Sequence, residues 1–168
     1  MAEITLKGNE INTIGNLPGI GELAPDFTLT KTDLLDVSLS DYKGKKVILN
    51  IFPSLDTPVC AMSVRRFNAE AAKLDNTVIL CISRDLPFAH KRFCTTEGLE
   101  NVVPLSELRN DEFSKKYGVK IIDGPMAGLM ARAVIILDES GVIKYKELVP
   151  EILQEPDYEK ALEELRGI

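Results

Sequence analysis

The sequence lacks the features of a protein that binds nucleic acids or spans membranes. It carries 26 acidic against 20 basic residues, a formal net charge of −6, and its basic residues form only isolated pairs. This charge disfavours broad electrostatic binding to nucleic acid or to an anionic membrane. No stretch approaches the length of about 18 apolar residues that a membrane helix needs, and the first eight residues do not resemble a secretory signal. We therefore expect a cytoplasmic protein with no nucleic-acid or membrane partner.

Cysteine and histidine are scarce. The chain has three cysteines, Cys60, Cys81 and Cys94, and one histidine, His90. An odd number of cysteines does not suit the disulfide framework of a secreted protein, whereas cytosolic disulfides are usually catalytic or sensing. His90 precedes Cys94 by one helical turn, but this pair is too small a ligand set for zinc. We expect no metal site, and we expect His90 to be a surface residue.

The remaining composition is that of an ordinary globular domain. The chain has 168 residues, of which 45% are apolar, and it contains no repeat or low-complexity segment. A chain of this length buries roughly two thirds of the surface that its unfolded form exposes, so it needs no disulfide for stability. We expect one domain over residues 1–168, with residues 1–18 as an N-terminal hairpin extension.

The apolar runs predict an α/β fold. Residues 45–52 and 77–83 are apolar and β-branched, as in strands covered on both faces, and residues 58–74 show the apolar repeat of a helix. This order predicts parallel strands joined by a right-handed crossover. The other predicted elements are a hairpin of 4–6 and 10–14, strands at 26–30 and 101–105, helices at 87–96, 111–117 and 157–165, and a hairpin of 131–137 and 142–148. Together they predict a thioredoxin-type arrangement, a mixed central sheet flanked by helices.

Cys60 stands at the start of the helix predicted for residues 58–74. Thr57 is a good N-cap residue, and Pro58 suits the first helical position. In the first turn, unpaired backbone N–H groups and the positive end of the helix dipole favour a thiolate, which is the nucleophilic form of cysteine. Cys60 is therefore the candidate nucleophile, and the alternative is a small core residue at a helix start.

The other two cysteines lead to different expectations. Cys81 lies inside the apolar run 77–83, where a free cysteine behaves as a small buried hydrophobe. Cys94 lies on the predicted helix 87–96. With Cys60 as its partner it becomes a candidate resolving residue, because a sulfenic acid beside a second thiol condenses to a disulfide.

The sequence around these cysteines resembles the peroxiredoxins. P-S-L-D-T-P-V-C at 53–60 matches the active-site pattern P-x-x-x-T-x-x-C of that family, and the segments 80–83, 85–89 and 92–94 resemble its thiol peroxidase branch, the atypical two-cysteine peroxiredoxins. With the N-terminal hairpin, the resemblance extends over essentially the whole chain. It implies that Cys60 is the peroxidatic cysteine and that Cys94 is its resolving partner in the same subunit.

The resemblance also implies roles for three further residues. Thr57 would hold the peroxide through its hydroxyl group, and Pro53 would shield the thiolate from water. The distant arginine of the family corresponds to Arg132, which precedes the strand 133–137. Its guanidinium would favour the thiolate and bind the peroxide oxygens as negative charge develops. Without the resemblance, Arg132 would be interpreted as an ordinary cation at a strand end.

The resemblance implies a hydroperoxide substrate, thioredoxin as the reductant, a homodimer, and no metal, haem, flavin or nucleotide cofactor. No phosphate-binding glycine motif is present either. Two other functions stay open: a peroxide-sensing interaction protein that uses the same cysteine pair, and a thioredoxin-fold binding module with inert cysteines. A disulfide oxidoreductase is less favoured, since that chemistry normally requires C-x-x-C and the sequence has none.

Overall fold

Seven strands form a mixed sheet in the computed structural model, which describes all 168 residues. The strands are β3 (Thr28–Thr30), β4 (Asp36–Ser38), β5 (Lys46–Ile51), β6 (Thr77–Ser83), β7 (Val103–Ser106), β8 (Ala133–Leu137) and β9 (Ile143–Leu148). Their order is β4-β3-β7-β6-β5-β8-β9. The strands β5, β6 and β7 are parallel, and the other pairs are antiparallel. The expected mixed sheet is therefore confirmed.

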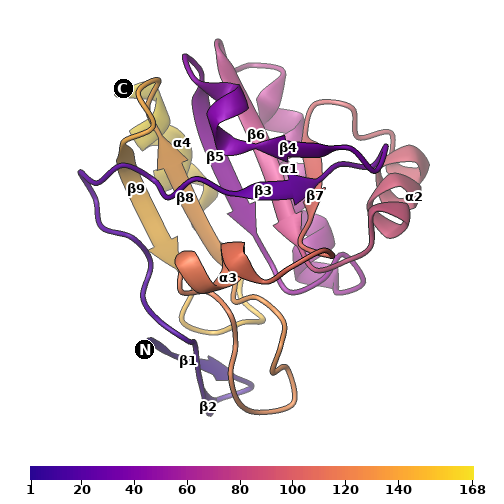
Figure 1. The fold of residues 1–168 in the computed structure, drawn as a ribbon, viewed down its shortest axis with the longest axis vertical. Coiled ribbons are helices and arrows are strands. Elements are labelled where there is room, and N and C mark those ends of the chain that lie inside the picture. Colours follow the sequence, from indigo (N-terminus) through magenta and orange to yellow (C-terminus); the bar gives the residue numbers. More distant parts are fainter.

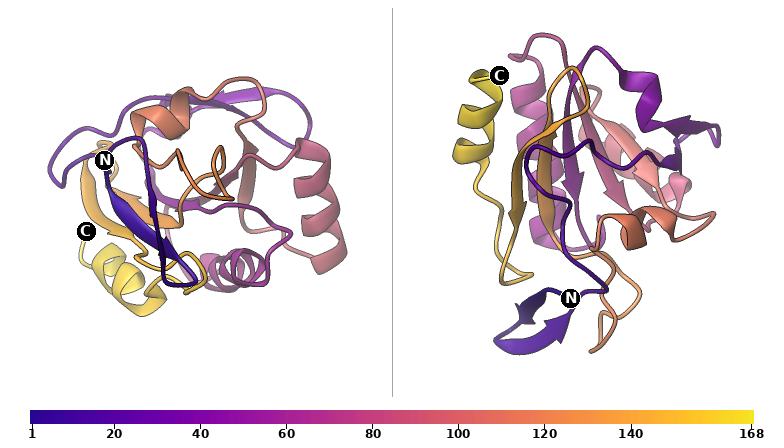
Figure 2. Two further views of the ribbon diagram at one scale, coloured as in Figure 1. Left: turned by 90° about the horizontal axis from the view of Figure 1, so that it is seen from below. Right: turned by 60° about the vertical axis from the view of Figure 1, so that its left-hand side comes forward.

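Helices cover both faces of this sheet (Figure 1). The helices are α1 (Pro58–Ala71), α2 (Pro87–Glu97), α3 (Glu112–Lys116) and α4 (Tyr158–Arg166), with a 3₁₀ helix η1 (Leu39–Tyr42). Figure 2 shows α1 and α4 on one side of the central strands, η1 and α3 on the other, and α2 at the edge. None of the helices combines the length and the apolar character needed to cross a bilayer.

The continuous apolar runs of the central strands follow from burial on both faces. On β5, Ile48 faces the side of α1 and α4, whereas Leu49 and Ile51 face the side of η1 and α3. We call the apolar cluster on the side of α1 and α4 the helix-side core, and the apolar cluster on the side of η1 and α3 the strand-side core. The helix-side core comprises Ile48, Phe52, Leu55, Cys60, Val64, Phe67, Ile79, Cys81, Val102, Val134, Ile136, Tyr145, Tyr158, Ala161 and Leu165. The two cores bury β5 and β6 from opposite faces. The segments that carry Cys60 and Cys94 follow the ends of these two strands.

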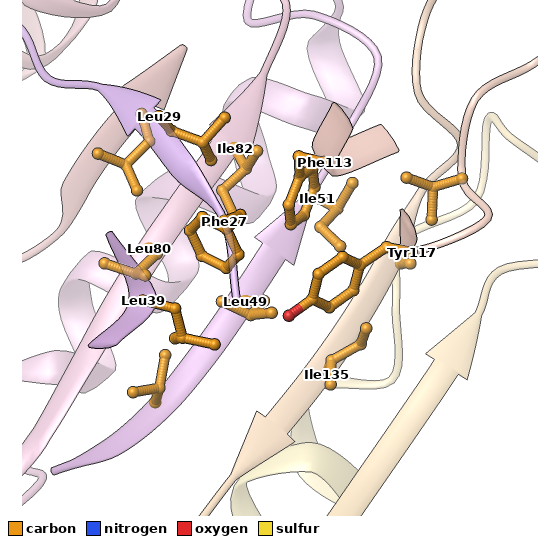
Figure 3. Close-up of a cluster of buried hydrophobic side chains, with 14 of the residues drawn as sticks. Phe27, Leu29, Leu39, Leu49, Ile51, Leu80, Ile82, Phe113, Tyr117 and Ile135 are labelled. Carbon is orange, nitrogen blue, oxygen red and sulfur yellow. The ribbon is translucent and has the colours of Figure 1, made fainter. Parts of the chain in front are cut away.

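Three aromatic side chains pack among the aliphatic ones of the strand-side core (Figure 3). Phe113 and Tyr117 are stacked with ring centroids 4.5 Å apart, and Phe27 meets Phe113 edge-on at 5.0 Å. The Tyr117 hydroxyl donates to the Pro25 carbonyl oxygen at 2.6 Å. These contacts join the loop before β3 to α3 across the central strands.

The N-terminal hairpin is a separate two-stranded sheet of β1 (Glu3–Leu6) and β2 (Asn9–Asn12) (Figure 1). Its buried Ile4 and Ile11 pack with Ala131 and Ile152 in a third apolar cluster. The Ile152 N–H also donates to the Thr5 carbonyl oxygen at 2.9 Å. The hairpin predicted from sequence is confirmed. It packs against the segments that contain Ala131 and Ile152.

Several boundaries differ from the predicted ones. The first long helix ends at Ala71 rather than near residue 74, and β4 and η1 were not predicted. The strand β4 has three residues at the edge of the sheet, without an apolar alternation, and it exists because it pairs with β3. The helix α2 begins at Pro87 and ends before Gly98, as predicted, and Gly98 adopts the left-handed conformation at φ 67°.

Candidate active site

Cys60 lies in the first turn of α1, as the sequence pattern predicts. The backbone N–H groups of Val59 and Cys60 have no acceptor within the chain, as expected for a helix start. The Cys60 side chain is 0% exposed and packs among Phe52, Leu55 and Val64 in the helix-side core. The sulfur is therefore held in a water-poor environment at the positive end of a helix dipole.

The loop between β5 and α1 is fixed by the Asp85 carboxylate. Its oxygens accept hydrogen bonds from Ser54 Oγ at 2.7 Å and from the Leu55 N–H at 2.8 Å. Thr57 occupies the predicted N-cap position, but its hydroxyl does not cap α1 and instead donates to the Ser54 carbonyl oxygen at 2.9 Å. Because its hydrogen is used there, Thr57 Oγ1 keeps its lone pairs as acceptors. Pro53 is buried in the same loop.

Arg132 lies at the same end of the sheet as this loop, because the following residue, Ala133, pairs with Ile51 at the end of β5. The alternation of side chains along a strand puts Arg132 on the face of Val134, which belongs to the helix-side core with Cys60. Arg132 is only 2% exposed, and its Nε and Nη2 donate to the Ile152 carbonyl oxygen at 3.0 and 2.8 Å. Its Nη1 is buried without a partner. Arg132 is therefore a buried cation with an unused donor.

Cys94 lies on α2, half-buried, and both Cys60 and Cys94 are free thiols within intact helices. Burial raises the pKa of Cys94. The helix α2 is joined to α1 by Arg65, whose guanidinium donates to Glu97 at 2.8 Å and lies 5.7 Å from the centre of the Phe93 ring. Cys60 and Cys94, 34 residues apart in the sequence, thus lie on two neighbouring helices.

We call the loop between β5 and α1, which leads into Cys60, the Cys60 loop. A cleft of about 270 Å³ separates it from α2. Leu55 and Asp56 line it from the loop, and Arg92 and Phe93 line it from α2. A second cavity of about 410 Å³ lies at the other end of the sheet, between η1 and the β8–β9 turn, and none of the candidate site residues lines it. No group of three or more His, Cys, Asp or Glu side chains is placed to hold a metal ion.

Cys81 is buried at 1% exposure, which confirms the predicted environment. Burial raises the pKa of its thiol to about 12, so that the thiol stays protonated at neutral pH. The Asn50 amide lies 3.8 Å from the Cys81 sulfur and 3.3 Å from Ser63 Oγ, and Ser63 Oγ donates to the Cys60 carbonyl oxygen at 2.8 Å. Cys81 thus belongs to the packing beneath α1.

The predicted surface position of His90 is wrong, since the side chain is only 1% exposed. Its Nε2 lies 3.1 Å from Ser83 Oγ, which donates to Asp85 at 2.6 Å, and its Nδ1 is buried without a partner. Burial lowers the pKa of His90 to about 4. The helix α2 has no clear apolar stripe, so its pattern did not show which face turns inward.

Ser83 and Asp85 were missed as site residues, although a signal was present. Ser83 ends the buried strand β6 and Asp85 follows it, while Ser54 follows the parallel strand β5. Because parallel strands bring their carboxyl ends to one edge of a sheet, as Figure 1 shows for β5 and β6, polar residues after two such strands lie close together.

Comparison with known proteins identifies the family of the chain. The sequence profile of the redoxin family matches residues 20–162. The chain belongs to the redoxin family. This redoxin is 60% identical over 162 residues to the thiol peroxidases of Mycobacterium bovis and Mycobacterium tuberculosis, and these matches span 96% of this chain and 97% of each relative.

Solved structures share the fold of this redoxin. A peroxiredoxin-like protein from Aquifex aeolicus superimposes with a TM-score of 0.94 at 35% identity, covering 99% of this chain and 97% of the other. The thiol peroxidase of Chromobacterium violaceum has the same fold, with a TM-score of 0.89 at 24% identity over 99% of this chain and 97% of that protein. The thioredoxin-like fold and the resemblance to thiol peroxidases are confirmed, and this redoxin is a thiol-dependent peroxidase.

Proposed function

We propose that this chain reduces hydroperoxides through a sulfenic acid on Cys60 and a disulfide between Cys60 and Cys94 of the same subunit. The Cys60 thiolate attacks the terminal oxygen of the peroxide, the O–O bond breaks, and the leaving oxygen takes a proton and departs as alcohol or water. The Cys94 thiol then attacks the Cys60 sulfur, the disulfide forms and water leaves. A dithiol reductant returns both sulfurs to thiols.

The burial of Cys60 in the first turn of α1, with two unpaired N–H groups beside it, is the observation that carries this proposal. Such N–H groups stabilise negative charge on the sulfur and on the transferring oxygen. Thr57 Oγ1, whose hydrogen is already donated to Ser54, would accept a hydrogen bond from the peroxide. The buried Pro53 would keep water from the sulfur.

Arg132 would bind the peroxide oxygens through Nη1. A buried guanidinium nitrogen without a partner is rare, because leaving it unpaired costs free energy. The two bonds from Nε and Nη2 to the Ile152 carbonyl would hold the side chain still while Nη1 donates to the leaving oxygen. The positive charge would also favour the thiolate.

The proposed disulfide requires movement. Packed helix axes lie about 8–10 Å apart, whereas a disulfide needs Cα atoms within about 7 Å. Cys60 and Cys94 lie on the neighbouring helices α1 and α2. The first turn of α1, the Cys94 segment, or both would therefore unwind locally.

We also propose the partners and setting of this cycle. Thioredoxin is the reductant that suits an intrasubunit disulfide in a cytoplasmic protein, and a homodimer is the assembly that we expect to find by light scattering. Residues 1–168 would act as one domain, with residues 1–18 as its extension. The odd number of cysteines without a C-x-x-C pair supports a reducing compartment, the cytoplasm.

A steady-state assay with thioredoxin, its reductase and a panel of hydroperoxides tests the proposal. The wild type should turn over, Cys60→Ser should be inactive, and Cys94→Ser should form a sulfenic acid that dimedone traps but no intrasubunit disulfide. Rapid oxidation without turnover by any dithiol protein would instead support a peroxide sensor. Retained activity in Cys60→Ser would place the nucleophile elsewhere.

A further inference from the structure

One carboxylate joins the two segments that carry the candidate redox cysteines. Asp85 accepts hydrogen bonds from Ser54 Oγ and the Leu55 N–H in the Cys60 loop. It also accepts from Ser83 Oγ at 2.6 Å, and Ser83 Oγ lies 3.1 Å from His90 Nε2 on α2. His90 is one helical turn before Cys94, so this chain of contacts runs from the Cys60 loop to the Cys94 helix.

The contacts of Ser83 determine the protonation state of His90. Because the Ser83 hydroxyl hydrogen is donated to Asp85, its oxygen can only accept from His90, and Nε2 must carry the proton. Nδ1 is then the bare nitrogen, and it is buried without a partner. A second proton on Nδ1 would bury an N–H group with no acceptor, which is costly. The folded arrangement of α2 therefore favours the neutral imidazole.

The groups that surround His90 come from three segments. The strand β6 presents the Ser83 hydroxyl, and the turn after β6 presents Asp85, whose charge raises the pKa of His90. The segment after β5 presents the apolar ring of Phe52, with its centroid 6.5 Å from the imidazole. Burial lowers the pKa of His90 by more than the charge of Asp85 raises it.

We propose that His90 is a positioning residue that holds α2, and with it Cys94, in the folded arrangement while neutral, and that its protonation releases α2 so that Cys94 can reach Cys60. This inference rests on the proposed function, in which Cys94 resolves the Cys60 sulfenic acid. Acid would then favour the unwound state in which the disulfide forms.

The sign of the effect follows from the two pKa values of His90. Burial lowers its pKa to about 4 in the folded helix, and on unwinding it returns to its ordinary value of about 6.5. The stabilisation of folded α2 is therefore complete above about pH 6.5 and is lost as the pH falls toward 4. Between about pH 8 and pH 5 the ratio of unwound to folded α2 should rise roughly 30-fold.

The single histidine of the chain allows a direct test on the untagged wild-type protein. Its imidazole resonance can be titrated by NMR in the reduced protein and in the oxidised protein, with the Cys60–Cys94 disulfide verified by mass spectrometry. We expect a midpoint near 4 in the reduced protein and a midpoint near 6.5, the ordinary value, in the oxidised protein. Equal midpoints in the two redox states would overturn the inference.

Hydrogen exchange of α2 in the reduced protein provides a second arm that needs no peroxide chemistry. After correction for intrinsic exchange rates, the opening of residues 88–97 should increase roughly 30-fold from about pH 8 to pH 5 in the wild type and in Lys91→Gln, a control for charge on α2. His90→Gln keeps an N–H donor for Ser83 but does not titrate, so its opening should not respond to pH. A pH response in His90→Gln equal to that of the wild type would refute the role of His90.

The two arms separate this inference from the proposed function. If α2 opens with acid through His90 but peroxide never produces the Cys60–Cys94 disulfide, the proposed resolving role of Cys94 fails and the link between His90 and α2 stands. If the disulfide forms and α2 opening ignores pH, the proposed function stands and the inference about His90 fails.

Discussion

At the scale of single residues, the site contains groups that are costly to bury. Arg132 Nη1 and His90 Nδ1 are both buried without a hydrogen-bond partner. An unsatisfied buried polar group costs about 1–3 kcal/mol. For Arg132 the missing partner is the peroxide in our proposal, whereas His90 Nδ1 is the nitrogen at which the folded helix disfavours a second proton. In our proposals the unpaired Arg132 atom binds the substrate, and the unpaired His90 atom makes α2 sensitive to pH.

Arg132→Lys should slow the reaction with peroxide by about 100- to 1,000-fold, although the positive charge is kept. An ammonium group lacks the planar fork that bonds the Ile152 carbonyl with two nitrogens and leaves a third free. The second-order rate of Cys60 oxidation should be measured by stopped flow. Arg109→Lys, an exposed pair with Asp36, is the matched control. Equal rates for the two variants would mean that Arg132 is only a structural cation.

Cys81→Ser should leave turnover nearly unchanged while lowering the free energy of unfolding by about 1–3 kcal/mol. The substitution places a hydroxyl in the helix-side core at a position with 1% exposure. Urea unfolding and the peroxidase assay are to be run on this variant beside Cys60→Ser, which should lose activity and keep its fold. A well-folded but inactive Cys81→Ser protein would contradict the assigned roles.

At the scale of elements, α2 is held less firmly than its neighbours. Its side-chain links to α1 are the contact of Arg65 with the Phe93 ring and the Arg65–Glu97 ion pair, and both side chains of that pair are at least one-third exposed. Such exposed pairs contribute little to stability, because water and salt screen them. The strands β5 and β6, in contrast, are buried on both faces. The helix can therefore unwind while the sheet beneath it stays folded.

Oxidation should accordingly speed amide exchange in residues 57–64 and 88–97 and leave the central strands unaltered. In our proposal the disulfide forms only when the first turn of α1, the Cys94 segment, or both unwind. Exchange should be followed by mass spectrometry in reduced and oxidised protein, with α4 as the internal reference. Equal protection of both segments in the two redox states, with the disulfide present, would show that no unfolding step exists.

At the scale of the whole molecule, the N-terminal hairpin supports the candidate active site from a distance. Ile11 is 2% exposed and packs in the same cluster as Ile152, whose carbonyl oxygen holds Arg132. The first residues of the chain are thus connected to the guanidinium through one apolar cluster and one carbonyl group.

Ile11→Ala should lower the free energy of unfolding by about 2–5 kcal/mol, because it leaves a cavity in this cluster. It should also slow the peroxide step, because the Ile152 carbonyl becomes less well placed. Ile14→Ala is the matched control, since Ile14 is 38% exposed, and its effect should be about 0.5 kcal/mol or less. Urea unfolding and stopped-flow oxidation measure the two effects. Identical behaviour of the two variants would disprove the connection.

The sequence alone determined those parts of the site that depend on neighbouring residues. Pro53, Thr57 and Cys60 belong to one strand-to-helix junction, which local signals define: an apolar run, a cap residue and a proline at the first helical position. The ends of α2, at Pro87 and before Gly98, are set in the same local way. The buried state of Cys81 also follows from its place in a continuous apolar run.

Only the tertiary structure decided how these pieces meet. The burial of His90, the role of Asp85 as a shared anchor and the unpaired nitrogen of Arg132 each depend on residues from separate elements. The short strand β4 likewise exists only because β3 pairs with it. Local patterns cannot show these features, because a side chain's hydrogen-bond partners and burial are set by packing between segments that are distant in the chain.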